Sequence, residues 1–440
     1  MNIKNPKTTK MIFMIGGGIL VFLLIVLAIV LATRGDKDGP ITPQTQTGSD
    51  KVELEYWGLW EPESVMEPLI QEYQAMNEHV TIKYAQRSFN EYENTLYTRL
   101  QQGKTGEAPA PDIVKINNSW LYKFESLLAP LPQNIMDPSD YAQTFYPTCV
   151  ADFTGLSGEI YAIPIGIDGL ALFYNKVLLS QEALSEPPQD WDGIIELAKK
   201  LTKKDSSGRI TQAGLAMGTV NNVSHSADIF SFLLLQNNIE VAKVEGGFLK
   251  VDFDNPQAKS ALSFYRSFAQ EHEVWSTDLP LDLDMFFRGE LAMFFAPSWR
   301  VFDIIEAAPA IEFDIIPLPQ LQANDPVYYS MYWGESVSAS SAHKEEAWRF
   351  LKFLSEKESM QKFHANGSAI RAFGQPYSRI DLESELINSR YVGKIMEMAP
   401  GMKTWRMSQN STVEEYINLA IADNDLQIAQ ENINTFLSGL

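Results

Sequence analysis

The chain has 440 residues, 45% of them hydrophobic, a single cysteine and a formal net charge of −21 at pH 7. So acidic a chain is a poor partner for nucleic acid or anionic lipid, because both would repel it. The one cysteine, Cys149, cannot form a disulfide within the chain, so a hydrophobic core must hold the fold together.

The N-terminal end carries a membrane signal. Residues 1–10 contain three lysines, and residues 11–33 form an uncharged apolar run, long enough to cross a hydrocarbon core of about 30 Å as a helix. The excess of Lys before the run predicts a cytoplasmic N-terminus and an extracytoplasmic C-terminal body. A cleaved signal peptide is the alternative, but its apolar region is usually shorter and ends in small residues. We therefore predict a single-pass transmembrane anchor over residues 11–33, in the cell membrane.

Two further segments follow the anchor. Residues 34–50 are rich in Gly, Pro, Thr, Gln, Ser and Asp and have no apolar periodicity, which predicts a flexible stalk. Residues 51–440 are too many for one compact core and suit two lobes.

Strand and helix patterns alternate along this body. Alternating or continuous apolar runs predict strands, and apolar residues at helical spacing predict helices. The predicted strands are 52–57, 80–84, 112–116, 170–176, 291–295 and 313–317. The predicted helices are 65–76, 92–102, 191–202, 224–237, 256–271 and 343–354. Such alternation is typical of parallel sheets covered by helices, which bind ligands beyond the carboxyl ends of their strands.

Signatures of catalysis are scarce. The five histidines are scattered without metal-ligand spacing, and neither a glycine-flanked nucleophilic serine nor a phosphate-binding glycine loop is present. We predict a protein that is not an enzyme, with no catalytic residue, metal or cofactor. A carboxylate pair of the glycosidase kind stays open as an alternative.

Several aromatic residues, by contrast, lie in or beside predicted loops and close to polar side chains. They are Trp57, Trp60, Trp120, Trp299, Tyr332, Trp333 and Trp405. Binding pockets combine large apolar walls with a few placed polar groups, and an aromatic face can pack on the C–H face of a sugar. For any one of these residues, ordinary packing in the core is the competing interpretation.

Eight short segments follow one another along the body in a distinctive order: 110–114, 127–131, 158–164, 174–176, 187–191, 287–293, 297–299 and 347–351. This order over residues 51–440 resembles that of the extracellular solute-binding proteins of carbohydrate ABC importers, the maltose-binding-like group (family 1).

The resemblance implies a two-lobed, periplasmic-binding-protein-like α/β fold with hinge strands near 162–166 and 315–319. Lobe 1 would comprise about 51–164 and 318–365, and lobe 2 about 168–314 and 366–440. By position, Trp299 matches the family's cleft tryptophan, and Arg371 falls near its Pro-x-Arg segment, although Ala369 replaces the proline.

The candidate ligand-binding residues combine this resemblance with the loop aromatics and their polar neighbours. They are Trp57, Glu61, Asn118, Trp120, Asp168, Trp299, Tyr332, Trp333, Glu335, Arg371 and Trp405. Taken together, these features predict a membrane-anchored extracytoplasmic protein that captures a sugar or oligosaccharide and delivers it to the permease subunits of an ABC transporter.

Two alternatives remain at this point. Glu61, Asp168 and Glu335 would also suit a cationic solute, so the same fold could bind a polyamine, a peptide or another non-sugar solute. The second alternative is a membrane-anchored glycoside hydrolase.

Overall fold

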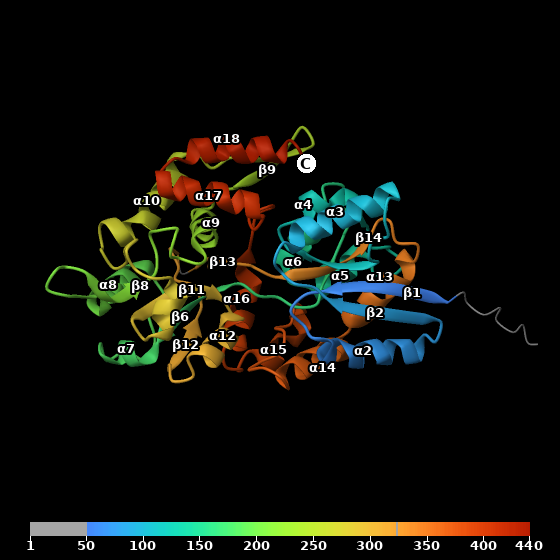
Figure 1. Ribbon diagram of the computed structural model, residues 1–440, viewed down its shortest axis with the longest axis horizontal. Coiled ribbons are helices and arrows are strands. Elements are labelled where there is room, and N and C mark those ends of the chain that lie inside the picture. Colours follow the sequence, from blue (N-terminus) through green and yellow to red (C-terminus); the bar gives the residue numbers. More distant parts are fainter. Residues whose placement is uncertain (1–50, 323) are drawn as a thin grey trace, which may run out of the picture. The chain divides into compact units, whose positions relative to one another are not determined.

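A computed structural model describes residues 51–322 and 324–440 of the chain. The predicted cytoplasmic end (1–10), anchor (11–33) and stalk (34–50) therefore lie outside the described residues. Within the described part, no helix combines the length and the apolar character needed to cross a bilayer. Two α/β lobes, each built on its own sheet, make up this part (Figure 1).

The sheet of lobe 1 has the strand order β2, β1, β3, β14, β4, with β5 paired to β14. Its strands are β1 (Val52–Gly58), β2 (Val80–Gln86), β3 (Ile113–Asn117), β4 (Leu128–Ala129), β5 (Ile163–Pro164) and β14 (Trp333–Ser338). Its helices are α2 (Glu63–Met76), α3 (Tyr92–Thr105), α4 (Leu121–Phe124), α5 (Pro138–Thr144), α6 (Pro147–Phe153), α13 (Lys344–Leu354), α14 (Lys357–Ser368) and α15 (Glu383–Leu386).

The sheet of lobe 2 has the order β12, β6, β11, β8, β7. Its strands are β6 (Leu170–Asn175), β7 (Lys203–Lys204), β8 (Ile210–Leu215), β11 (Leu291–Pro297) and β12 (Phe313–Ile316). Two separate two-stranded sheets accompany it: β9 (Ala242–Glu245) pairs with β10 (Phe248–Val251), and β13 (Tyr328–Tyr329) pairs with β15 (Met402–Lys403). Its helices are α7 (Lys176–Ser180), α8 (Trp191–Leu201), α9 (Ser226–Gln236), α10 (Pro256–Gln270), α11 (Asp282–Phe287), α12 (Arg300–Ala307), α16 (Val392–Met398), α17 (Ser411–Asp423) and α18 (Leu426–Leu437).

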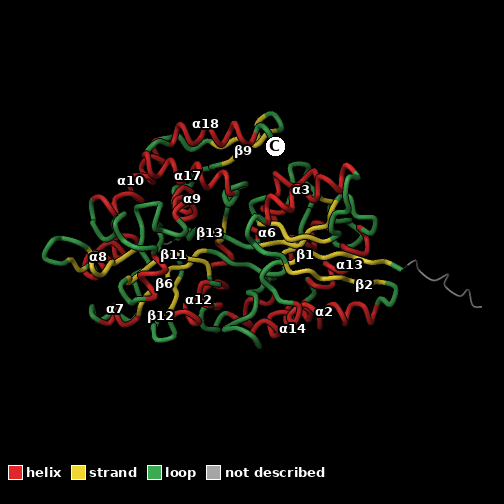
Figure 2. The backbone as a smooth tube through the Cα atoms, in the orientation of Figure 1, coloured by secondary structure: helices red, strands yellow, loops and turns green. Residues whose placement is uncertain are grey.

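The predicted strands and helices are confirmed, with ends that shift by up to three residues. β6 and β11 are buried at every position, as strands covered on both faces should be, and Figure 2 shows helices on both sides of the strands. The predicted parallel pairing holds for β1 with β2 and β3 and for β8 with β11, but both sheets also contain antiparallel strands. β14 runs antiparallel to β3, and β6 antiparallel to β11, because both strands enter their sheets after crossing from the other lobe.

The chain crosses between the lobes at residues 165–169 and again at 330–332. The two crossing segments lie side by side, with a backbone bridge between Gly169 and Ser330. A Cβ at residue 169 would lie 2.4 Å from the carbonyl oxygen of Tyr329, so this approach requires glycine. The first crossing therefore overlaps the end of the predicted segment 162–166.

The predicted crossing near 315–319 is wrong. Pro317 and Pro319 end β12, but the segment after them stays on lobe 2. Gln236 on α9 donates a hydrogen bond to the Pro319 carbonyl (2.9 Å), and the Gln320 amide donates one to the carbonyl of Gln189 (2.8 Å). The lobe 1 segment predicted to begin at residue 318 therefore begins after the 330–332 crossing.

The predicted boundary at residue 366 also moves toward the C-terminus. The amide of Tyr146 in lobe 1 donates a hydrogen bond to the carbonyl of Ser378, whereas Arg390 donates one to the carbonyl of Phe313 in lobe 2. Residues 376–386 accordingly pack on lobe 1, and the chain returns to lobe 2 before Arg390.

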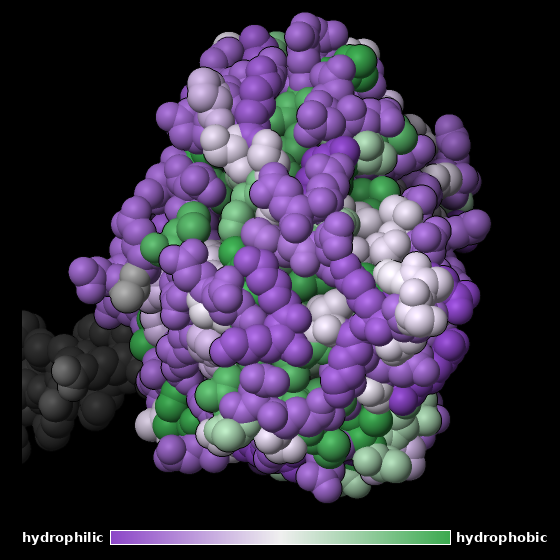
Figure 3. Space-filling view, turned by 90° about the vertical axis from the view of Figure 1, so that its left-hand side faces the viewer, coloured by the Kyte–Doolittle hydropathy of each residue, from purple (hydrophilic) through white to green (hydrophobic). Residues whose placement is uncertain are grey.

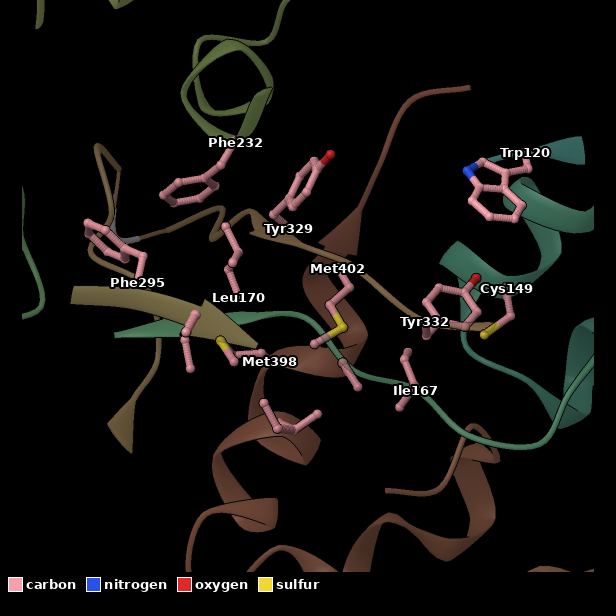
Figure 4. Close-up of a cluster of buried hydrophobic side chains, with 14 of the residues drawn as sticks. Trp120, Cys149, Ile167, Leu170, Phe232, Phe295, Tyr329, Tyr332, Met398 and Met402 are labelled. Carbon is pink, nitrogen blue, oxygen red and sulfur yellow. The ribbon is translucent and has the colours of Figure 1, made fainter. Parts of the chain in front are cut away.

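The buried core continues through the crossings. Figure 4 shows Ile167 and Met402 between an aromatic group of lobe 2, which includes Phe232 and Phe295, and a group of lobe 1 around Tyr332. Cys149 belongs to the lobe 1 group and is free and buried.

The surface of the protein is mostly polar where one face is seen in full. Figure 3 shows that the face at the lobe 2 end is largely hydrophilic, with hydrophobic residues in smaller patches. Scattered exposed hydrophobic residues of this kind are ordinary for a folded protein.

Candidate ligand-binding cleft

Two adjoining cavities lie between the lobes and share the side chains of Trp60, Trp299, Met331 and Trp333. The narrow compartment has a volume of about 260 Å³ and is lined by these four residues and Glu61, Asp168, Ser298, Phe302, Asp303, Tyr332, Arg371, Phe373, Gly374, Gln375 and Pro376. The wide compartment has about 650 Å³ and is lined by the four shared residues and Phe89, Asn90, Glu91, Tyr92, Glu93, Asn94, Asn117, Trp120, Ser224, His225, Asp228, Arg300, Gln409, Ser411 and Glu414.

Lobe 1 supplies an aromatic wall. The ring centroid of Trp333, at the start of β14, lies 5.0 Å from that of Trp120 and 6.2 Å from that of Trp60, both edge-on. Phe89 extends the wall, with its ring centroid 4.9 Å from that of Trp60. Trp60 and Phe89 are 46% and 50% exposed, so a large part of each side chain remains accessible to a ligand.

The end of β1 explains why Trp60 lies in the cleft. A Cβ at Gly58 would lie only 2.2 Å from the hydroxyl oxygen of Tyr84, so glycine is needed where this ring crosses β1. The same hydroxyl donates a hydrogen bond to the carbonyl of Glu61 (2.7 Å) and holds the following loop. Within that loop, Trp60 adopts a φ of 54°, in the left-handed region that a bulky residue rarely occupies.

Lobe 2 supplies the opposite wall. Trp299 lies between β11 and α12 and is 40% exposed, with the guanidinium of Arg300 4.2 Å from its ring centroid. The carboxylate of Asp168 fixes the turn before it, because it accepts hydrogen bonds from the Ser298 hydroxyl (2.9 Å), the Ser298 amide (3.2 Å) and the Gly169 amide (2.8 Å). Burial raises the pKa of Asp168 to about 7, although the hydrogen bonds from these donors act to lower it.

A buried ion pair closes the narrow compartment. Oε1 of Glu61 lies 2.8 Å from Nη2 of Arg371, and the two side chains are 3% and 19% exposed. The guanidinium also lies 5.1 Å from the ring centroid of Phe302 on α12 of lobe 2, so Arg371 contacts both lobes.

Seven of the predicted site residues line the cleft. They are Glu61, Trp120, Asp168, Trp299, Tyr332, Trp333 and Arg371. The hydroxyl of Tyr332, however, points into the core and donates a hydrogen bond to the carboxylate of Asp152 (2.7 Å).

The other four predicted site residues are buried and line neither compartment. Trp57 packs under Arg87, with the guanidinium carbon 3.9 Å from its ring centroid. Asn118 is 1% exposed and holds the second crossing, Glu335 forms an ion pair with Lys115 (2.8 Å), and Trp405 is 5% exposed. Each has packing or a partner inside the protein instead of access to the cleft.

The candidate list also omitted residues that line the cleft. Trp60 was among the loop aromatics and could have been included on that ground. Phe89 carried no comparable signal. His225 and Asp228 begin α9, and Glu414 lies on α17, so only the packing of these helices reveals that they reach the cleft.

A two-lobed α/β fold with an aromatic cleft between its lobes is the architecture of a binding protein. The chain belongs to the family described as bacterial extracellular solute-binding protein, whose model matches residues 68–372. This family and fold are those of substrate-binding proteins rather than enzymes, which sets the glycoside hydrolase alternative aside.

Individual relatives are distant. The maltotriose-binding protein of Pyrococcus abyssi is 24% identical over 79% of this chain and 70% of its own length. The multiple sugar-binding protein of Streptococcus mutans is 21% identical over 75% of this chain and 77% of its own.

Solved structures share the fold. A cyclo/maltodextrin-binding protein complexed with maltotetraose has a TM-score of 0.69 at 17% identity, covering 90% of this chain and 98% of its own. A solute-binding protein of Thermotoga lettingae bound with α-D-tagatose has a TM-score of 0.65 at 21% identity, covering 88% of this chain and all of its own.

The Glu61–Arg371 pair predicts a large effect on stability. Arg371→Met should lower the free energy of unfolding by about 3–5 kcal/mol, because it leaves the carboxylate of Glu61 buried without a cation. Glu61→Gln combined with Arg371→Met should recover part of this loss, as measured by urea unfolding. Arg349→Met removes an exposed pair and should cost under about 1 kcal/mol. Equal losses in both Arg variants would contradict a structural role for the pair.

Asp168 predicts a pH dependence. Its folded-state pKa of about 7 exceeds the ordinary aspartate pKa of 3.8, so between these values the folded state binds more protons than the unfolded state. The free energy of unfolding therefore falls as pH rises through this window, by up to about 4 kcal/mol from this group. Relative to the parent chain, Asp168→Asn should thus gain stability between pH 4 and pH 8 in urea titrations, whereas the exposed control Asp423→Asn should not. A pH-independent difference for Asp168→Asn would contradict the raised pKa.

Proposed function

We propose that this protein captures a sugar or oligosaccharide in the cleft between its lobes and delivers it to the permease of an ABC transporter. The observation that carries the proposal is the position of Trp60 and Trp333 on lobe 1 and of Trp299 on lobe 2, all lining both compartments. Aromatic faces pack on the apolar faces of sugar rings, and fixed polar groups orient the hydroxyls. The sugar ligands named for several relatives and fold neighbours support the same class of solute.

The polar groups of the narrow compartment suit a neutral solute. The negative charge of Glu61 is offset by Arg371, and Asp168 is held by three protein donors. Glu335, the third acidic residue that had favoured a cationic solute, faces Lys115 away from the cleft. These three residues therefore give no support for a polyamine or peptide.

Contacts from both lobes give the solute a way to favour a closed arrangement. A ligand shifts a conformational equilibrium only as far as it binds one state better than the other. A sugar held between Trp60 and Trp299 satisfies this condition, because its two contacts belong to different lobes. A permease that recognises the closed arrangement would then receive only the loaded protein.

The anchor and stalk complete the proposal. Residues 11–33 retain the protein in the membrane with residues 1–10 in the cytoplasm, and residues 34–50 tether a body whose first strand, β1, begins at Val52. A flexible coil of about 16 residues spans roughly 20–25 Å, which keeps the cleft close to a permease at high effective concentration.

Substitutions in the cleft test the binding proposal. Neutral oligosaccharides are first screened by thermal shift against the full chain, purified in a detergent that contains no sugar, because a bound ligand raises stability by mass action. For each saccharide found, Trp60→Ala and Trp299→Ala should each weaken binding at least about tenfold in calorimetry, because truncating an aromatic anchor costs about 2 kcal/mol or more. Phe248→Ala, which removes an exposed aromatic side chain outside the cleft, is the control. Unchanged affinity in both Trp variants would refute the site.

The anchor has its own test. Mass spectrometry of the protein extracted from membranes should find the N-terminal residues 1–10 attached to the chain. A mature protein that starts near residue 33 would show a cleaved signal and remove the tether from the proposal.

A further inference from the structure

The wide compartment is lined by carboxylates from both lobes. Asp228 on α9 and Glu414 on α17 line it from lobe 2, and Glu91 and Glu93 line it from lobe 1. Burial raises the pKa of Glu414 well above its usual range, and the charges of Asp228 and Glu93 add to the effect. All three carboxylates line the same compartment. A cation bound beside them would oppose this rise and favour the ionised form of Glu414.

The cations near this compartment are already engaged. Lys123 lies 2.7 Å from Glu93 and is buried with it, and Asn410 also donates to Glu93. Arg300 pairs with Asp303 on its own helix (2.7 Å) and stacks over Trp299. Neither Asp228 nor Glu414 forms an ion pair with a lysine or arginine of the described residues.

Asp228 and His225 have unused hydrogen-bonding capacity at the wall of the compartment. Oδ2 of Asp228 lies 3.0 Å from Nδ1 of His225. Oδ1 of Asp228 and Nε2 of His225 have no partner in the described part of the chain, although the two residues are only 5% and 9% exposed. A buried polar atom without a partner costs free energy, and a buried carboxylate costs more. A ligand group that supplies donors and positive charge would offset this cost.

We propose that the wide compartment binds the protonated amino group of an amino-bearing saccharide, held by Asp228 and Glu414. This inference rests on the proposed function, because the sugar body would lie on the tryptophans that both compartments share. An ammonium group offers three donors and one positive charge, which match the free carboxylate oxygens. A metal ion fits less well, since no group of three or more His, Cys, Asp or Glu in residues 51–322 and 324–440 has a metal-binding arrangement.

A matched set of sugars tests the inference on the full chain in a sugar-free detergent. The probes are the 2-amino, 2-acetamido and 2-hydroxy forms of glucose, of galactose, and of the β-1,4-linked glucose trisaccharide. The acetamido form keeps the nitrogen and removes its charge. Calorimetry at pH 7 should show an amino form binding roughly tenfold or more tighter than both matched forms, since hydrogen bonds to charged groups contribute about 1.5–3 kcal/mol. Raising the salt from 50 to 300 mM should reduce this preference.

Substitutions test whether Asp228 and Glu414 cause the preference for amino forms. Asp228→Asn combined with Glu414→Gln should abolish the amino preference, whereas Glu415→Gln, on the exposed neighbour of Glu414 on α17, should retain it. Glu414→Gln alone serves if the double variant does not fold, as judged by circular dichroism, and should reduce the preference. The comparison of amino with acetamido forms needs no variant at all.

The outcomes separate the two proposals. If hydroxyl or acetamido forms bind as tightly as the amino forms, or if the preference survives in folded Asp228/Glu414 variants, the amino-group inference is overturned and the sugar-binding proposal stands. If no amino form binds but neutral sugars do, the inference is likewise overturned. If neither these probes nor the oligosaccharide screen yields any binding, the sugar-binding proposal itself fails.

Discussion

The side chain of Asn118 anchors the strand on which the cleft depends. Its side-chain Oδ1 accepts a hydrogen bond from the backbone amide of Tyr332, and its Nδ2 donates one to the carboxylate of Asp152 (2.9 Å). The backbone amide of Asn118 also donates to the Tyr332 carbonyl (3.0 Å). The Tyr332 hydroxyl returns to the same carboxylate. This network fixes the chain as it leaves lobe 2, so that Met331 faces the cleft and Trp333 begins β14 beside the aromatic wall of lobe 1. Because a buried network of this kind is stable only when its members are satisfied, it defines one position for the crossing.

The acidic side chains at the two ends of the cleft differ in the partners that the protein gives them. At the narrow end the protein supplies its own partners, Arg371 for Glu61 and three donors for Asp168. At the wide end, Asp228 and Glu414 lie among other acidic groups without a lysine or arginine partner in the described residues. Trp60, Trp299 and Trp333 connect the two ends. One extended ligand could therefore lie on a continuous aromatic surface while meeting different polar surroundings at its two ends.

Local patterns predicted the main elements well because most of these strands and helices bury either a periodic apolar face or a continuous apolar run, as β6 and β11 do. They could not predict the chain crossings, since Pro317 and Pro319 end a strand whether or not the chain then changes lobe. The sequence also could not show whether a polar residue at a strand end contacts a ligand or a partner inside the protein. Asn118 and Glu335 are residue types that often contact ligands, yet Asn118 donates a hydrogen bond to Asp152 and Glu335 forms an ion pair with Lys115. Asp228 and Glu414 lie on helices, and only the packing of α17 against α9 brings them together.

In the proposed mechanism, a saccharide binds between the lobes and holds them together. Paired spin labels test it most directly, and the burial of Cys149 leaves introduced cysteines as the reactive positions. Labels at the exposed residues Met76 of α2 and Val177 of α7 report the separation of the lobes. A saccharide should shift and narrow this distance distribution at concentrations that match its calorimetric affinity, and the Trp299→Ala variant should require more saccharide for the same shift. A saccharide that binds while the distribution stays unchanged would contradict it.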